Sequence, residues 1–94
     1  MLIPKNDKEL TRWLHEHPAG YVLHTRRSAN PRYMVLHRAS CFMIRPKLGT
    51  ALGSATQFGY RKVCADDVSE LQDWVRRHGR LDGSFSSRCR RCRP

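Results

Sequence analysis

Two cysteines near the C-terminus, Cys89 and Cys92, are separated by two arginines. This spacing lets both thiolates turn onto one metal ion and is typical of half of a zinc site. A chain of 94 residues buries a limited core, so a metal ion that ties two segments together adds much to its stability. The tail around the pair is rich in arginine and serine and has little apolar surface to bury. The pair therefore predicts that a metal clips the tail to the rest of the fold.

The other half of such a site needs two more ligands. His37 and Cys41 are the first candidates, because they are separated by three residues at the end of a predicted strand. Cys64, at the end of another predicted strand, is the substitute. We therefore expect one structural Zn²⁺ held by His37, Cys41, Cys89 and Cys92. Plainer interpretations stay open: the cysteine pair is redox-active or idle, Cys64 is a small buried apolar residue, and His37 lies on the surface.

The first half of the chain has the pattern of a helix followed by a hairpin. Asn6 or Asp7 caps a helix that runs to about His15. The apolar stripe of this helix consists of Leu10, Trp13 and Leu14. Two strands follow at 21–25 and 32–37, joined by a basic loop. They predict an antiparallel hairpin.

The second half begins with a short apolar strand, Phe42–Ile44, and a long loop over 45–57. A third strand, Phe58–Cys64, leads into the clearest helix, which Asp66 caps and Gly79 ends. The predicted fold class is α+β, a small antiparallel sheet of three to four strands packed by two helices and stapled by one structural zinc. We expect a single basic domain over residues 1–94.

The charge of the chain points to a polyanionic partner. Eighteen Lys and Arg stand against eight Asp and Glu, which gives a formal net charge of +10 and a pI of about 10.4. Arginine predominates, and its planar guanidinium matches phosphate oxygens and the guanine edge. No basic amphipathic helix, lipidation signal, membrane span or signal peptide is evident, so we expect no membrane binding and a cytoplasmic location. In that compartment the cysteines are thiols or metal ligands rather than disulfides.

The positive residues gather on loops, strands and tail, whereas the acidic residues lie almost wholly in the two helices. This segregation is typical of electrostatic nucleic-acid binding, although a generically basic surface would explain part of the charge. Tyr60 and Tyr33 are the aromatic residues best placed to stack on a base. The predicted nucleic-acid-binding residues are Arg26, Arg27, Arg32, Arg38, Arg45, Lys47, Tyr60, Arg61, Lys62, Arg90 and Arg91.

No catalytic motif is evident in the sequence. The glycine-containing loop over 49–56 lacks the Lys-Ser/Thr ending of a P-loop. A Cys–His nucleophile built from Cys41 or Cys64 with His24 or His37 would have little room for a substrate pocket beside it. We therefore expect a domain that is not an enzyme.

Several strings of the sequence carry a resemblance to a known group of domains. They are Gly20-Tyr-Val-Leu-His-Thr-Arg-Arg-Ser, Tyr33-Met-Val-Leu-His-Arg-Ala-Ser-Cys41, Tyr60-Arg-Lys-Val-Cys64-Ala, Glu70-Leu-Gln-Asp-Trp74 and Cys89-x-x-Cys92-x-Pro94. Together they resemble a small uncharacterised domain of actinobacteria, similar to modules fused to HNH-type modification-dependent restriction endonucleases and other DNA-processing proteins. The resemblance implies a targeting or DNA-binding module without nuclease residues. It also implies that Cys64 belongs to the pattern, which leaves five candidate ligands for four places.

Two functions follow from these observations. The first is a non-catalytic, zinc-stabilised domain that binds nucleic acid, most of all double-stranded DNA, as a targeting module in restriction or defence. RNA and single strands stay open as targets. The alternative is a protein-interaction module of a defence or toxin–antitoxin system, whose basic face binds an acidic protein partner.

Overall fold

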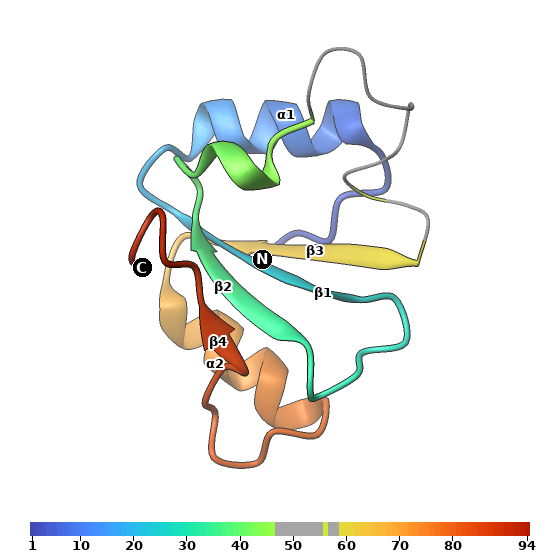
Figure 1. Cartoon of the computed structure of the whole chain (residues 1–94). Helices are drawn as coiled ribbons and strands as arrows, with labels where there is room; N and C mark the ends of the chain where they lie inside the picture. The colour runs from blue at the N-terminus through green and yellow to red at the C-terminus, as the bar shows by residue number, and fades with distance from the viewer. Residues whose placement is uncertain (47–55, 57–58) are drawn as a thin grey trace.

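Four strands form one sheet with a helix on each face (Figure 1). The computed structural model describes residues 1–46, 56 and 59–94. Its elements are α1 (Asp7–Glu16), β1 (Tyr21–Arg26), β2 (Met34–Arg38), the 3-10 helix η1 (Phe42–Ile44), β3 (Tyr60–Ala65), α2 (Val68–Arg77) and β4 (Ser87–Arg88). The strand order is β3-β1-β2-β4, with β1 antiparallel to both neighbours and β4 parallel to β2. The predicted α+β class is confirmed.

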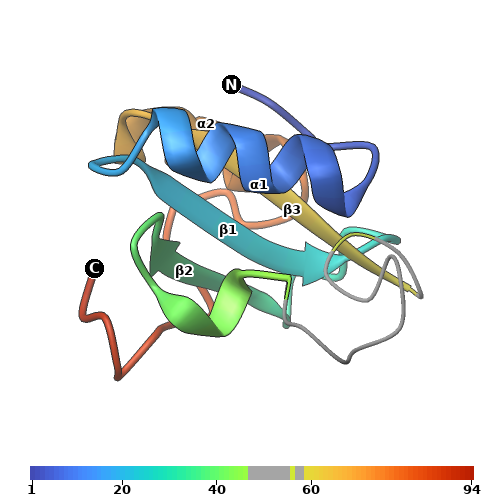
Figure 2. The same ribbon diagram turned by 90° about the horizontal axis from the view of Figure 1, so that it is seen from above.

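The two helices bury their apolar stripes against opposite faces of the sheet (Figure 1). Successive side chains of a strand point to opposite faces, so Val22 of β1 packs on the α1 side and Leu23 on the α2 side. The α1 core contains Leu10, Trp13 and Leu14, and the α2 core contains Leu71, Trp74 and Val75. In the view from above, α1 lies along the sheet next to the segment that contains η1 (Figure 2). The sheet therefore separates two small cores.

Side-chain caps explain where the helices begin. The Asn6 side chain accepts a hydrogen bond from the Glu9 amide at 2.8 Å, as predicted. At the second helix the cap is Asp67, which accepts from the Ser69 amide at 3.0 Å, and the prediction of Asp66 is wrong by one residue. Asp66 instead lies 2.7 Å from a ring nitrogen of His17.

The end of α2 also follows the prediction. Gly79 directly follows His78, the C-cap residue of α2, and its φ is +108°. That left-handed conformation is open to glycine at little steric cost, so it turns the chain out of the helix.

Three strand predictions need correction. Phe42–Ile44 is a 3-10 helix and not a strand, because the outer edge of β2 is already paired with β4. That fourth strand, Ser87–Arg88, was not predicted. The second strand begins at Met34 rather than Arg32, since the chain still turns at Asn30. The third strand runs Tyr60–Ala65, and the start predicted at Phe58 lies outside the described residues, as does most of the loop over 45–57.

The C-terminal tail runs along the edge of β2. Its hydrogen bonds begin at Ser86, whose hydroxyl accepts from the Met34 amide at 2.7 Å and whose amide donates to the Met34 carbonyl at 2.9 Å. Further along, the Cys89 amide donates to the carbonyl of Leu36 at 2.9 Å. The tail is thus aligned with β2 before it reaches its cysteines. None of the helices in the described part of the chain has the length and apolar character needed to span a bilayer.

Candidate metal centre

The four residues predicted as ligands lie together at the end of β2. The ligand atoms of His37, Cys41, Cys89 and Cys92 are all within 4.8 Å of one another. Three of the residues are buried and Cys92 is partly buried. The cluster could hold a metal ion such as zinc.

The pairing of β2 with β4 explains why distant residues meet here. Leu36 pairs with Arg88 in a parallel register, so the following residues, His37 and Cys89, lie side by side. Cys41 returns toward them through a tight turn in which its amide donates to the Arg38 carbonyl at 3.0 Å. A second turn, closed by the Arg93 amide donating to the Cys89 carbonyl at 3.0 Å, brings Cys92 back. Strand pairing therefore places Cys89, and two backbone turns place Cys41 and Cys92.

The sulfur geometry agrees with a tetrahedral zinc site. The Sγ atoms of Cys41 and Cys89 are 3.9 Å apart. Two thiolates at the usual Zn–S distance of about 2.3 Å in a tetrahedron are separated by about 3.8 Å. A disulfide would need about 2.05 Å, and all four cysteines of the chain are free thiols. The spacing of this pair is that of metal ligands.

Backbone amides stabilise sulfur in its charged form. The Arg38 amide donates to Cys92 Sγ at 3.2 Å. Burial disfavours ionisation of Cys89, but hydrogen bonds from the amides of Cys92 and Arg91 outweigh it and lower the pKa of this thiol. Burial raises the pKa of Cys41 to about 11, so this thiol is protonated at neutral pH, and a metal ion bound there would displace its proton. These amide donors could not be predicted from the sequence, because they depend on the two turns.

His37 supplies the observation that bears most directly on a metal. Its Nδ1 is buried, and among the described residues it has no hydrogen-bond partner. Burial, with a smaller effect of the nearby Lys62 charge, lowers the pKa of His37 to about 4. The imidazole is therefore neutral at neutral pH, the form in which it binds metal ions. A buried nitrogen without a partner is costly, and a metal ion bound by that nitrogen would remove the cost.

Cys64, the predicted substitute ligand, does not belong to this cluster. It is fully buried in β3, where its backbone pairs with Leu2 through hydrogen bonds of 2.7 and 2.8 Å. Its side chain packs in the α1 core, and burial raises the pKa of the thiol to about 12. The interpretation of Cys64 as a small apolar core residue fits this position. Four of the five candidates therefore form the cluster.

The basic residues predicted to bind nucleic acid divide into groups. Those exposed on the hairpin turn are Arg27 and Arg32, and those exposed on the tail are Arg90 and Arg91. Arg38 and Arg45 are exposed, but both also form hydrogen bonds to backbone carbonyls. Arg38 donates to the carbonyls of Cys92 and Arg93 at 3.0 Å each, and Arg45 donates to the Ser40 carbonyl at 3.1 Å. No carboxylate in the described part of the chain forms an ion pair with any of these six arginines.

The remaining predicted nucleic-acid-binding residues lie in different environments: Arg26, Tyr60, Arg61, Lys62 and Lys47. Arg26 lies over the rings of Tyr33 and Tyr60, with its guanidinium carbon 5.3 and 5.1 Å from their centroids. Lys62 is only 5% exposed, so it is not part of the basic surface. Arg61 follows the alternation of β3 and points to the opposite face from Lys62. Lys47 lies outside the described residues.

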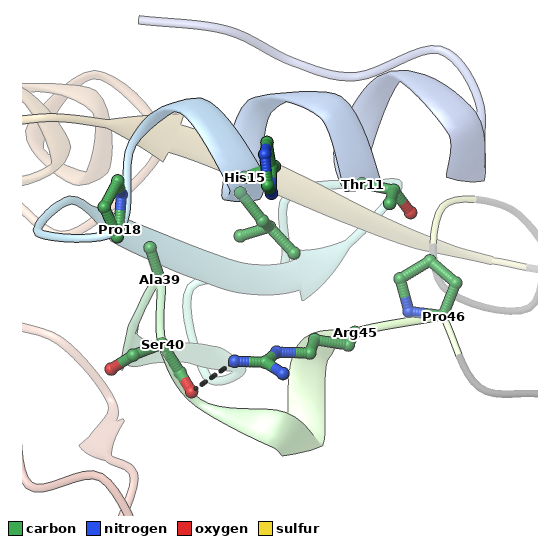
Figure 3. Close-up of a pocket in the computed structure, with 8 residues that line it drawn as sticks. Thr11, His15, Pro18, Ala39, Ser40, Arg45 and Pro46 are labelled. Atoms are coloured by element: carbon green, nitrogen blue, oxygen red, sulfur yellow. Dashed lines mark hydrogen bonds between the residues drawn. The ribbon is translucent and has the colours of Figure 1, made fainter.

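A separate hollow of about 370 Å³ lies between α1 and the segment after β2 (Figure 3). Its walls carry His15 and Thr11 on one side and Ser40 and Arg45 on the other, and Arg45 is held by its bond to the Ser40 carbonyl. It contains no cysteine and no carboxylate among the described residues. None of the predicted metal ligands faces it.

No family model, curated protein or solved structure matches this chain. The resemblance to the actinobacterial domain therefore stays a prediction, and any functional argument rests on the residues themselves.

Proposed function

We propose that this chain is a non-catalytic nucleic-acid-binding domain, with duplex DNA as its target and a structural zinc ion that fixes its basic tail. The observation that carries the proposal is a set of exposed arginines, on the hairpin turn and on the tail, without a carboxylate partner among the described residues. Their charge is not neutralised within the molecule, and phosphates would neutralise it.

The metal centre and the basic tail are parts of one segment. Arg90 and Arg91 lie between the two tail ligands, Cys89 and Cys92, and both arginines are exposed. A zinc ion bound by these cysteines would hold the short loop between them in one conformation. The two guanidinium groups would then meet phosphates with less loss of conformational entropy than on a free tail. In this role zinc supplies structure and no reaction.

Salt dependence of DNA binding tests the proposal. Binding of a fluorescent duplex of about 20 base pairs is measured by anisotropy at about 50 and 200 mM salt. Each phosphate contact contributes about −0.9 to the slope of log K against log salt, so four to six contacts predict a slope of about −4 to −5. Absence of binding at the lower salt concentration would exclude the proposal.

A matched pair of double variants locates the surface. Arg90→Ala with Arg91→Ala removes two exposed tail arginines and should reduce the magnitude of the slope by about 2. Arg76→Ala with Arg77→Ala removes an equal charge from exposed positions on α2 and should leave the slope unchanged. Equal loss in both variants would mean that net charge alone, and not this surface, drives binding. Co-purification with a stoichiometric acidic protein and no binding of any nucleic acid would favour the protein-interaction alternative.

A further inference from the structure

A second cleft, of about 490 Å³, opens on the face of the sheet that α1 partly covers. Its floor is formed by β1, β2 and β3, and its walls by η1 and by the tail from Ser87 to Arg90. The volume lies within the range of about 300–1,000 Å³ that is usual for ligand pockets. His37 and Cys89 form its boundary with the metal centre. The cleft and the metal centre are therefore neighbours that share one wall.

Hydrogen-bonding groups lie at the floor of the cleft. His24 of β1 and Lys62 of β3 are register partners, and Lys62 Nζ lies 2.8 Å from His24 Nδ1. An ammonium group can only donate, so the Nδ1 of His24 accepts this bond and its Nε2 carries the ring proton. Burial, followed by the charge of Lys62, lowers the pKa of His24 to about 3, which agrees with a neutral ring. The floor thus contains an imidazole that Lys62 holds in one orientation and one tautomer.

Aromatic and aliphatic side chains lie beside His24 and Lys62. The ring of Tyr33 meets His24 edge-on at 5.5 Å between centroids, Tyr60 stacks on His24 at 5.0 Å, and the two tyrosine rings are 6.1 Å apart, so the three rings form one cluster. Val35 and Met43 add aliphatic surface to the lining, and Met43 is 47% exposed. Tyr33 and Met43 both line the cleft, so a flat heteroaromatic ring bound there would meet an aromatic and an aliphatic side chain. This is the kind of surface on which nucleobases stack.

The outer part of the cleft is cationic. Arg90, which is exposed, lines it from the tail. Arg88 pairs with Leu36 of the α2 core and holds its guanidinium 5.5 Å over the ring of Phe85, so this side chain lies on the other face of the sheet. No carboxylate in the described part of the chain lines the cleft. The lining thus offers aromatic contact inside and one arginine outside, which matches a base with its phosphate.

We infer that this cleft binds one nucleobase, from a nucleotide that is unpaired in or extruded from the duplex, with the adjacent phosphate against Arg90. The inference rests on the proposed function and adds to it a site for one base. Duplex binding through the hairpin turn and tail needs no such cleft, so the two can be tested apart.

The experiment compares three duplexes of the same length and charge. One is fully paired, one has a single bulged thymine at its centre, and one has a bulged abasic residue there. Stacking of one base on an aromatic side chain corresponds to roughly a tenfold gain in affinity. The bulged-thymine duplex should therefore bind about tenfold more tightly than the paired duplex, and the abasic duplex should bind like the paired one.

Two variants test the cleft itself. Tyr33→Ala removes the half-exposed ring, and Met43→Glu places a carboxylate on the wall at an exposed position, so both variants should fold. Each variant should abolish the tenfold preference for the bulged-thymine duplex. Tyr33→Ala should change the affinity for the paired duplex by less than about twofold. Ser69→Glu, which adds the same charge on α2, and Tyr21→Leu, which removes a tyrosine that packs on the α2 side, should keep the preference.

The outcomes separate the two proposals. Failure to bind any of the duplexes at low salt would overturn both. Equal binding of all three duplexes would overturn the cleft assignment and leave duplex binding in place. Tight binding of the abasic bulge would mean that bent DNA, and not a base in the cleft, is recognised. A preference that survives both Tyr33→Ala and Met43→Glu would also exclude the cleft.

Discussion

Replacement of Cys92 by alanine should release the C-terminal tail from β2 while the helices and the β3-β1-β2 sheet stay folded. Cys92 is the last of the four clustered residues along the chain, and it is only partly buried. Its loss removes one proposed zinc ligand without opening a cavity in either core. The expected effect is therefore local, on residues 87–94, rather than global.

The magnitude follows from the few contacts that hold the tail. Ordering about eight residues costs about 12 kcal/mol, at about 1.5 kcal/mol each. Among the described residues, six hydrogen bonds outside the strand ladder tie the tail to β2: two between Met34 and Ser86, one from Cys89 to Leu36, and three from the amide and guanidinium of Arg38 to the last turn. At about 1 kcal/mol each, these bonds return about 6 kcal/mol. The proposed zinc would cover the deficit of about 6 kcal/mol, because structural zinc contributes about 10 kcal/mol or more in zinc-finger peptides.

Hydrogen exchange of the tail measures this effect. In the zinc-loaded protein the Cys89 amide, which donates to the Leu36 carbonyl, should exchange slowly. In Cys92→Ala, and in the unmodified protein after chelation, exchange should approach that of an unfolded peptide. Cys64→Ala is the matched control, because it removes a free thiol outside the cluster and should keep both the metal and the protection. Undiminished protection in metal-free Cys92→Ala would refute the reasoning.

Three further predictions concern the cores and the pH dependence of stability. Leu71→Ala, at a fully buried position, should lower the free energy of unfolding by about 2–5 kcal/mol. Leu81→Ala, at a position 86% exposed, should change it by less than about 0.5 kcal/mol. Equal effects of the two variants in urea titrations would argue against the packing of the α2 core. Gly20→Ala would place a Cβ 2.7 Å from the Trp13 ring and should cost about 1–3 kcal/mol, so an unchanged melting temperature would contradict the packing of α1 on β1. Because burial lowers the pKa of His24 from 6.5 to about 3, the unfolded chain takes up a proton in this window that the folded protein does not. The free energy of unfolding should then fall as the pH drops below about 6.5, by up to about 1.4 kcal/mol per pH unit from His24, and His37, whose pKa is lowered to about 4, adds to the fall. Identical urea midpoints at pH 7 and pH 5 would be inconsistent with this prediction.

The helices and the hairpin could be predicted because their signals are local. Caps at Asn6 and near the start of α2, and apolar residues at helical spacing, depend only on neighbours along the chain. β4 could not be predicted in this way. It has two exposed residues and no alternation, and it exists because the tail pairs with the free edge of β2.

The candidate metal site could be predicted from cysteine and histidine spacing, but the choice between ligands could not. His37 and Cys64 both lie at the ends of predicted strands and next to apolar residues, so the local sequence does not distinguish them. Only the register of β2 with β4 places His37 beside Cys89 and leaves Cys64 among apolar neighbours. The position of Lys62 was missed for the same reason. Its charge suggested the surface, whereas its register with His24 places it at the floor of a cleft.

X-ray absorption at the zinc edge of the purified protein tests the central claim most directly, namely that one zinc ion joins the tail to the end of β2. The spectrum should show one zinc per chain with three sulfur ligands at about 2.3 Å and one nitrogen ligand at about 2.0 Å. That shell corresponds to Cys41, Cys89, Cys92 and His37. A four-sulfur shell would place Cys64 in the site instead of His37, and a folded, metal-free protein with a protected tail would contradict the claim altogether.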